Sequence, residues 1–105
     1  MQIFKLVPRN LHHKDWRNSL WQEKVVVRAP SEQTAREVAS HAFTVKVPFI
    51  PGIPLPRDPW RQEVLVEAST IEKGKVREPD WLAGGRVQIL DPVGYNGALE
   101  GRRWE

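Results

Sequence analysis

Residues 25–43, VVVRAPSEQTAREVASHAF, decide the fold, because they contain a strand, a helix and a well-marked junction between the two. Three consecutive valines favour an extended chain. Pro30 disfavours helical geometry at the residue before it. Ser31 is a good N-cap, since its hydroxyl can accept a hydrogen bond from an amide of the first helical turn. The sequence therefore predicts a strand over 23–29 and a helix over 32–43.

The predicted helix carries one narrow apolar stripe. Its members recur at the helical spacing i, i+3, i+4 and i+7, and they are Ala35, Val38, Ala39 and Ala42. Such small side chains allow the helix to approach a sheet closely. Arg36 falls outside the stripe, so we expect it on the solvated side of the helix near Glu32, in an i, i+4 pair worth about 0.3 kcal/mol.

Three further segments have the composition of strands. Residues 2–7 are rich in strand-favouring side chains and end at Pro8, where a backbone donor is lost. Residues 61–70 place Val64, Val66 and Ala68 on one face, and residues 86–91 also alternate. The intervening residues 9–20 and 71–85 have no sustained period and are expected to be connections, the first with an apolar anchor at Trp16.

This order of elements, β-β-α-β-β, predicts an α+β fold of two layers. We expect a four-stranded, mainly antiparallel sheet with the helix on one face. Val25 and Val27 should point to one side of it, and Val26 and Arg28 to the other. The second face should be solvated by Lys24, Arg28, Glu63, Glu67 and Gln88. Some of the five tryptophans, at positions 16, 21, 60, 81 and 104, should pack over it from loops.

The length of 105 residues predicts a single domain over 1–105. Residues 92–105 hold three glycines without periodicity, so we expect a flexible tail unless Tyr95, Leu99 or Trp104 docks. The chain has no cysteine, which excludes disulfides, thiolate nucleophiles and iron–sulfur clusters. No window approaches the ~20 apolar residues of a membrane span. These features predict a soluble, cytoplasmic protein that does not bind membranes.

The charge balance is basic, with 16 Lys and Arg against 13 Asp and Glu. The basic residues are spread along the chain and interleaved with acids, which is typical of a mixed solvated surface. Folding could nevertheless gather several of them into one patch. A basic nucleic-acid-binding domain is therefore the alternative function, with Lys73, Lys75, Arg77 and Arg86 as the contacting residues.

A proline-rich segment, residues 47–60, is the best candidate for a binding surface. Five prolines exclude regular strand pairing there, while interspersed apolar side chains would hold the segment in an extended form. The predicted contact residues are Phe49, Ile53, Leu55, Arg57 and Trp60. They would bind another protein or a small apolar ligand. In the competing interpretation, the Trp60 side chain is buried in the core and the segment has only a structural role.

Few residues suggest catalysis. Adjacent side chains of an extended chain point in opposite directions, so His12 and His13 are poorly placed to share a metal ion. No nucleophile elbow, phosphate-binding loop or zinc-binding helix motif is present. The sequence therefore predicts no catalytic residue, no metal and no cofactor. It favours a small non-enzymatic interaction or ligand-binding module, whose oligomeric state it leaves open.

The stretch VRAPSEQTAREVASHAF, residues 27–43, resembles small uncharacterised bacterial α+β proteins. The similarity consists of a strand that ends in Arg-Ala and a helix of the form Ser-Glu-x-x-Ala-Arg-x-x-Ala. These proteins have no established activity, so the resemblance implies no particular function and identifies no functional residue.

Overall fold

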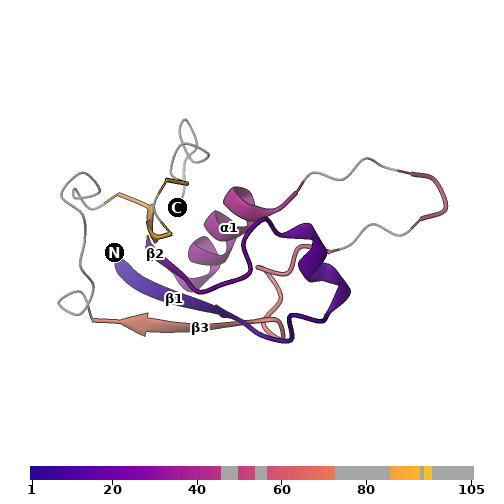
Figure 1. Cartoon of the computed structure of the whole chain (residues 1–105). Coiled ribbons are helices and arrows are strands. Elements are labelled where there is room, and N and C mark those ends of the chain that lie inside the picture. Colours follow the sequence, from indigo (N-terminus) through magenta and orange to yellow (C-terminus); the bar gives the residue numbers. More distant parts are fainter. Residues whose placement is uncertain (46–49, 54–56, 73–85, 93, 96–105) are drawn as a thin grey trace.

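One helix lies against one face of a four-stranded antiparallel sheet (Figure 1). The computed structural model describes residues 1–45, 50–53, 57–72, 86–92, 94 and 95. Its elements are β1 (Gln2–Pro8), the 3-10 helix η1 (Lys14–Asn18), β2 (Val25–Ala29), α1 (Glu32–Phe43), β3 (Val66–Ile71) and β4 (Gln88–Asp91). The predicted α+β class and element order are confirmed.

The strand order in the sheet is β3-β1-β2-β4. β1 lies between β2 and β3, and both of these strands run antiparallel to it. β2 and β3 are therefore parallel to each other, and α1 connects them across β1. β4 pairs antiparallel with β2 and forms the second edge. The antiparallel pair of β1 and β2 thus provides the surface on which the rest of the chain assembles.

The junction between β2 and α1 forms as the sequence predicts. The Ser31 hydroxyl accepts a hydrogen bond from the Thr34 amide at 3.2 Å, so it caps the first turn. The helix ends at Phe43, where the Thr44 amide donates to the Ser40 carbonyl at 3.0 Å. Local rules therefore set the start of α1.

The third strand begins later than the alternation of residues 61–70 predicts. Hydrogen bonds from the Leu65 and Val66 amides to the Gln62 carbonyl, at 3.1 and 3.0 Å, close turns there instead. These turns bury Leu65 and leave Val64 with 78% of its surface exposed. The strand prediction is wrong at Val64, because residues 62–66 form turns before β3 starts. In these turns the Leu65 side chain enters the core and the Val64 side chain faces solvent.

Pro8 ends one strand ladder and leaves the other intact. In an antiparallel strand, alternate residues direct both backbone groups to one neighbour. The Arg9 amide donates to the Leu65 carbonyl at 2.7 Å, toward β3, so Pro8 faces β2. Because proline has no N–H, pairing with β2 stops at Leu6 while pairing with β3 continues to Pro8. The chain before β2 therefore separates from β1.

The main core lies between the sheet and α1. It contains Phe4, Leu6, Trp16, Val25, Val27, Ala29, Ala35, Val38, Ala39, Phe43, Trp60, Leu65, Val66 and Ile89, all buried. A smaller cluster of Ile3, Val26 and Leu90 lies on the other face of the sheet. The predicted separation of Val25 and Val27 from Val26 is confirmed.

Arg36 is buried, which corrects the prediction that it lies on the solvated side. It keeps the predicted Glu32 partner at 3.2 Å. Its guanidinium also donates to the Trp60 carbonyl at 3.3 Å and to the Val66 carbonyl at 2.9 Å. The helical wheel could not indicate this, because the two acceptors come from a segment distant in sequence.

The second sheet face also differs from the prediction. Arg28 and Gln88 were expected to be solvated, but they are 4% and 8% exposed. Arg28 donates to the Gln88 side-chain oxygen and to the Arg86 carbonyl, the latter at 2.8 Å. Hydrogen bonding of the guanidinium makes its burial tolerable. Trp16 and Trp60 pack with α1 rather than over this face, while Trp81 and Trp104 lie outside the described residues.

The orientation of α1 leads to a prediction at Val38, which is fully buried against the sheet. Val38→Asp should lower the free energy of unfolding by about 4 kcal/mol, because an unpaired carboxylate enters the core. Urea unfolding measures the change. Gln33→Asp, on the exposed side of the same helix, is the control and should have little effect. Equal stability of both variants would contradict the packing of α1.

Candidate functional site

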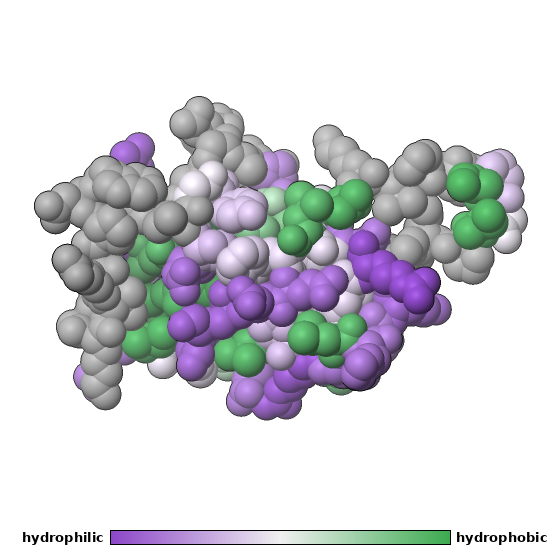
Figure 2. All heavy atoms as spheres, viewed as in Figure 1, coloured by the Kyte–Doolittle hydropathy of each residue, from purple (hydrophilic) through white to green (hydrophobic). Residues whose placement is uncertain are grey.

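The tip of the proline-rich segment stands apart from the body of the domain (Figure 1). The Ile53 amide donates to the Ile50 carbonyl at 3.1 Å and closes a four-residue turn. Pro51 and Gly52 are its central residues, and Gly52 has a φ of +83°, as a turn with Pro-Gly at its centre requires. Figure 2 shows hydrophobic side chains at the end of this projection. We call Ile50, Pro51, Gly52 and Ile53 the loop tip.

Both side chains that flank the turn are exposed. Ile50 has 49% and Ile53 has 57% of its surface accessible. Other exposed large hydrophobic residues exist, but Ile50 and Ile53 lie together on one turn. The loop tip therefore presents a compact pair of aliphatic side chains to the solvent.

The chain on each side of the projection is fixed to the body at a common base. Before it, the Val45 amide donates to the Asn18 carbonyl at 2.6 Å. After it, the Arg57 amide donates to Asp15 Oδ1 at 3.1 Å. The Thr44 hydroxyl joins the two sides by a 3.3 Å hydrogen bond to Asp58 Oδ1. We call Asp15, Thr44, Arg57 and Asp58 the loop base.

Asp15 is a buried carboxylate within this base, 3% exposed. Its Oδ2 accepts a 2.9 Å hydrogen bond from Gln62 Nε2. Burial alone raises the pKa of a carboxyl group. Here the hydrogen bonds from Gln62 and the Arg57 amide, together with the nearby positive charge of Lys14, outweigh burial, so the pKa of Asp15 lies below its ordinary value. The ionised form therefore stabilises the loop base.

Asp58 is the second carboxylate that stabilises the loop base, and it lies on the chain after the projection. Its Oδ1 also accepts the Trp60 amide at 2.9 Å. Its Oδ2 is buried and accepts no hydrogen bond from the described residues, although Arg61 Nε lies 3.4 Å away and balances the charge. Gln62 Nε2 donates to the Asp58 carbonyl at 3.0 Å and connects the two aspartates.

Trp60 lies inside the core, which corrects its predicted place on the binding surface. Its ring packs edge-on against Trp16 with centroids 5.3 Å apart, and it also contacts Phe43 at 5.6 Å. Its indole N–H donates to Ser19 Oγ at 2.9 Å. The side chain is fully buried and does not reach a partner at the surface. The competing interpretation, in which Trp60 plugs the core, describes its position.

The other predicted binding residues are placed differently. Ile53 and Arg57 are exposed, at the loop tip and the loop base respectively. Phe49 and Leu55 lie outside the described residues. Sequence reasoning missed Ile50 as a contact residue. The Pro-Gly pair at 51–52 was the available signal, because a turn there places its two flanking residues at the tip.

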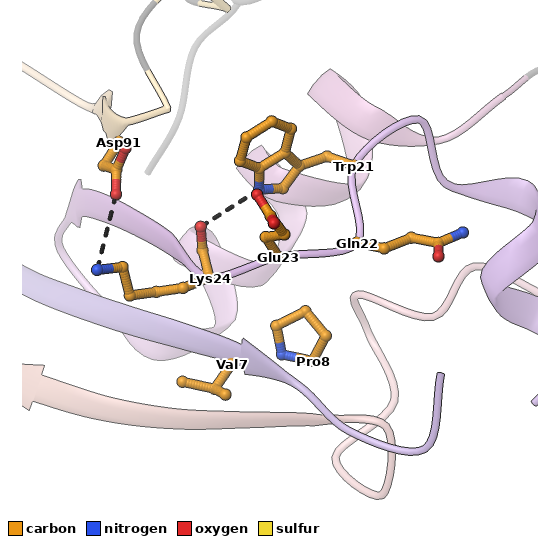
Figure 3. Close-up of a pocket in the computed structure, with 7 residues that line it drawn as sticks. All are labelled: Val7, Pro8, Trp21, Gln22, Glu23, Lys24 and Asp91. Atoms are coloured by element: carbon orange, nitrogen blue, oxygen red, sulfur yellow. Dashed lines mark hydrogen bonds and ion pairs between the residues drawn. The ribbon is translucent and has the colours of Figure 1, made fainter. Parts of the chain in front are cut away.

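A shallow hollow of about 490 Å³ lies where β1 ends and β2 begins. Figure 3 shows that Val7 and Pro8 line one side of it and Trp21 another, while Lys24 reaches across to Asp91. The Lys24 ammonium lies 3.9 Å from the Asp91 carboxylate. This hollow exists because Pro8 ends the pairing with the chain before β2. It combines apolar walls with one ammonium and the carboxylates of Glu23 and Asp91.

His13 has a structural role. His13 Nδ1 accepts the Asp15 amide at 3.1 Å and caps η1. Within the described ranges, no group of three His, Cys, Asp or Glu side chains could hold a metal ion. Of the predicted nucleic-acid contacts, Arg86 is exposed, and Lys73, Lys75 and Arg77 lie outside the described residues. Tyr95, at the start of the predicted tail, packs on Phe43 with centroids 4.8 Å apart.

No family model, curated protein or solved structure matches this chain. In the part of the chain that the structure describes, no helix has the length and apolar character needed to cross a membrane.

The lowered pKa of Asp15 predicts a pH dependence of stability. Its contribution is present above the ordinary carboxyl pKa of about 4 and is lost as the pH falls through the lowered value in the folded protein. Urea unfolding between pH 6 and pH 2 should therefore show a decline that is shallower in Asp15→Asn. Glu63→Gln, at an exposed position, is the control. Parallel curves for the parent and Asp15→Asn would contradict this role.

The position of Trp60 predicts a large effect of truncation. Trp60→Ala should lower the free energy of unfolding by about 3–5 kcal/mol, because it leaves a cavity beside Trp16 and Phe43. Trp21→Ala, which removes a half-buried indole, is the matched comparison and should cost clearly less. If the two variants unfold at the same urea concentration, Trp60 is not the centre of this core.

Proposed function

We propose that this protein is a small, non-enzymatic interaction module that inserts its loop tip into an apolar groove of a partner protein. The observation that supports this most directly is the exposure of Ile50 and Ile53, at 49% and 57%, on a turn that projects from a fixed base. A projecting aliphatic pair of this kind fits a concave apolar surface better than a flat one.

The energetics favour such a contact. Full burial of a fully exposed Ile side chain contributes about 1.5–3 kcal/mol. Because about half of the surface of Ile50 and of Ile53 is exposed, burial of both would contribute about that amount in total. Pro51 restricts the backbone, and hydrogen bonds fix both sides of the loop base. The turn at residues 50–53 is already closed by its own hydrogen bond, so these residues lose little conformational entropy when they bind.

Positive charges near the loop base indicate the character of the partner. Lys14 and Arg17 lie on η1, and Arg57 is held beside η1 by its bond to Asp15; all three are exposed. Figure 2 shows strongly hydrophilic side chains close to the foot of the projection. The negative charge of Asp15 is buried and hydrogen-bonded. We therefore propose a groove with acidic residues at its rim, which would speed association through complementary charge.

A membrane surface is a less suitable target for the same loop tip. Stable membrane attachment requires a larger apolar area or a second signal, whereas Ile50 and Ile53 provide a small one. A nucleic-acid-binding role stays a prediction, since three of its four proposed residues lie outside the described ranges. Neither alternative is supported by a feature as specific as the loop tip.

Site-specific photo-crosslinking tests the proposal. A photoreactive residue at position 53 should give one discrete crosslinked product with another protein in the cells from which the chain comes. The same residue at position 64 is the control, because Val64 is more exposed but lies away from the loop tip. Ile50→Ser, which keeps the turn and removes its second aliphatic contact, should reduce the product at position 53 at least fivefold.

Products of equal intensity from positions 53 and 64 would contradict the proposal, as would a product that Ile50→Ser leaves unchanged. Co-sedimentation with vesicles of zwitterionic and anionic lipids separates the membrane alternative. Sedimentation with vesicles that depends on Ile50 and Ile53, without a protein crosslink, would indicate that the loop tip binds a lipid surface and not a partner protein.

A further inference from the structure

The outer edge of β3 is open in the described part of the chain. β3 is the first strand in the order β3-β1-β2-β4, so one side pairs with β1 and no described strand pairs with the other. Figure 1 shows β3 along one margin of the molecule. An unpaired strand edge is a template for another strand unless charge, proline, a bulge or a covering element blocks it. Residues 66–71, VEASTI, contain no proline.

The register with β1 shows which backbone groups face outward. Arg9 pairs with Leu65 through a backbone hydrogen bond, and the pairs continue as Val7 with Glu67 and Lys5 with Ser69. Alternate residues of an antiparallel strand turn both backbone groups to the same neighbour. The odd-numbered residues of β3 therefore bond to β1, and Val66, Ala68 and Thr70 direct their N–H and C=O groups away from it.

One end of this edge is already occupied. The Val66 carbonyl accepts a 2.9 Å hydrogen bond from Arg36, and the Val66 amide donates to the Gln62 carbonyl at 3.0 Å. Both backbone groups of Val66 are therefore used within the chain. The outward groups left for another strand belong to Ala68 and Thr70.

We infer that the edge of β3 pairs antiparallel with β3 of a second copy of this chain, about a two-fold axis at Ser69. In this register Ala68 lies opposite Thr70 of the second copy, and Thr70 lies opposite its Ala68. Both pairs are hydrogen-bonded pairs, so the outward N–H and C=O groups of Ala68 and Thr70 in each copy find partners. The Val66 carbonyl keeps its hydrogen bond from Arg36. If the axis lay at Ala68, the pairing would need the backbone N–H and C=O of Val66, and both groups are already hydrogen-bonded within the chain.

The side chains permit this register. Ser69 would face Ser69 of the second copy, and Glu67 would lie opposite Ile71. The two Glu67 carboxylates would be about 13 Å apart along the strand direction, so they would not repel strongly. Glu67 also forms an ion pair with Arg9 of its own chain. Both sheets would join into one continuous sheet with the two helices on the same face.

A second copy fits this edge better than an arbitrary extended peptide does. In both copies Ala68 and Thr70 supply the donors and the acceptors. Two-fold symmetry therefore satisfies the same backbone groups of each copy. The opposite edge, β4, is shorter and ends at Asp91, which pairs with Lys24. The contact between β3 edges is independent of the loop tip and of the function proposed for it.

Charge substitution at Ser69 tests the inference, because the two copies of this residue would be about 5 Å apart. Sedimentation equilibrium of the parent protein should show its mass rising from 12.1 kDa toward twice that value as concentration increases. Ser69→Lys and Ser69→Glu should each weaken this association at least tenfold. An equimolar mixture of the two variants should restore it, since opposite charges then face each other. Gln33→Lys, an exposed change on α1, should associate like the parent.

Hydrogen exchange gives an independent readout. The Ala68 and Thr70 amides should become protected as the parent's concentration rises, while other exposed amides do not change. A parent that stays monomeric throughout the concentration range would overturn the inference. So would a dimer that both Ser69 variants retain, or a loss of association that mixing does not restore while both variants keep the parent's thermal midpoint.

Discussion

The packing of Trp60 between Trp16 and Phe43 connects the two halves of the chain. Trp16 belongs to η1 and Phe43 to the end of α1, and both precede the proline-rich segment, whereas Trp60 is the last residue of that segment. The residue also uses its polar groups, since its indole N–H reaches Ser19 and its carbonyl accepts from Arg36. A single buried residue thus determines where the chain returns to the body before β3.

This return explains why an apolar loop tip can stand in solvent. The sequence between α1 and Trp60 is rich in apolar residues, which would ordinarily collapse onto a core. Asp15 and Asp58 instead hold the two sides of the loop at its base, through hydrogen bonds to Arg57 and Thr44. With the base fixed, the turn at Pro51 and Gly52 keeps Ile50 and Ile53 exposed.

Two departures from regular sheet pairing create the other surfaces of interest. Pro8 cannot donate toward β2, and the resulting separation forms the hollow beside Trp21. At the opposite side of the sheet, Arg36 satisfies the Val66 carbonyl and so limits the open edge of β3 to Ala68 and Thr70. In both places the surface that is left available follows from where individual backbone groups find partners.

Local sequence determined the elements whose ends depend on neighbouring residues. Pro30 and Ser31 mark the junction between β2 and α1, the alternation of valines separates the faces of β2, and the predicted element order β-β-α-β-β indicates the two-layer class. Tertiary structure decided the rest. Arg36 and Arg28 are buried because carbonyl acceptors reach them from residues that are 24 to 58 positions away. Trp60 is buried because two distant aromatic rings surround it, and β3 begins late because a turn at Gln62 replaces its first residues. Helical and strand periodicity describe neighbours along the chain, so they cannot report partners that only the folded arrangement brings together.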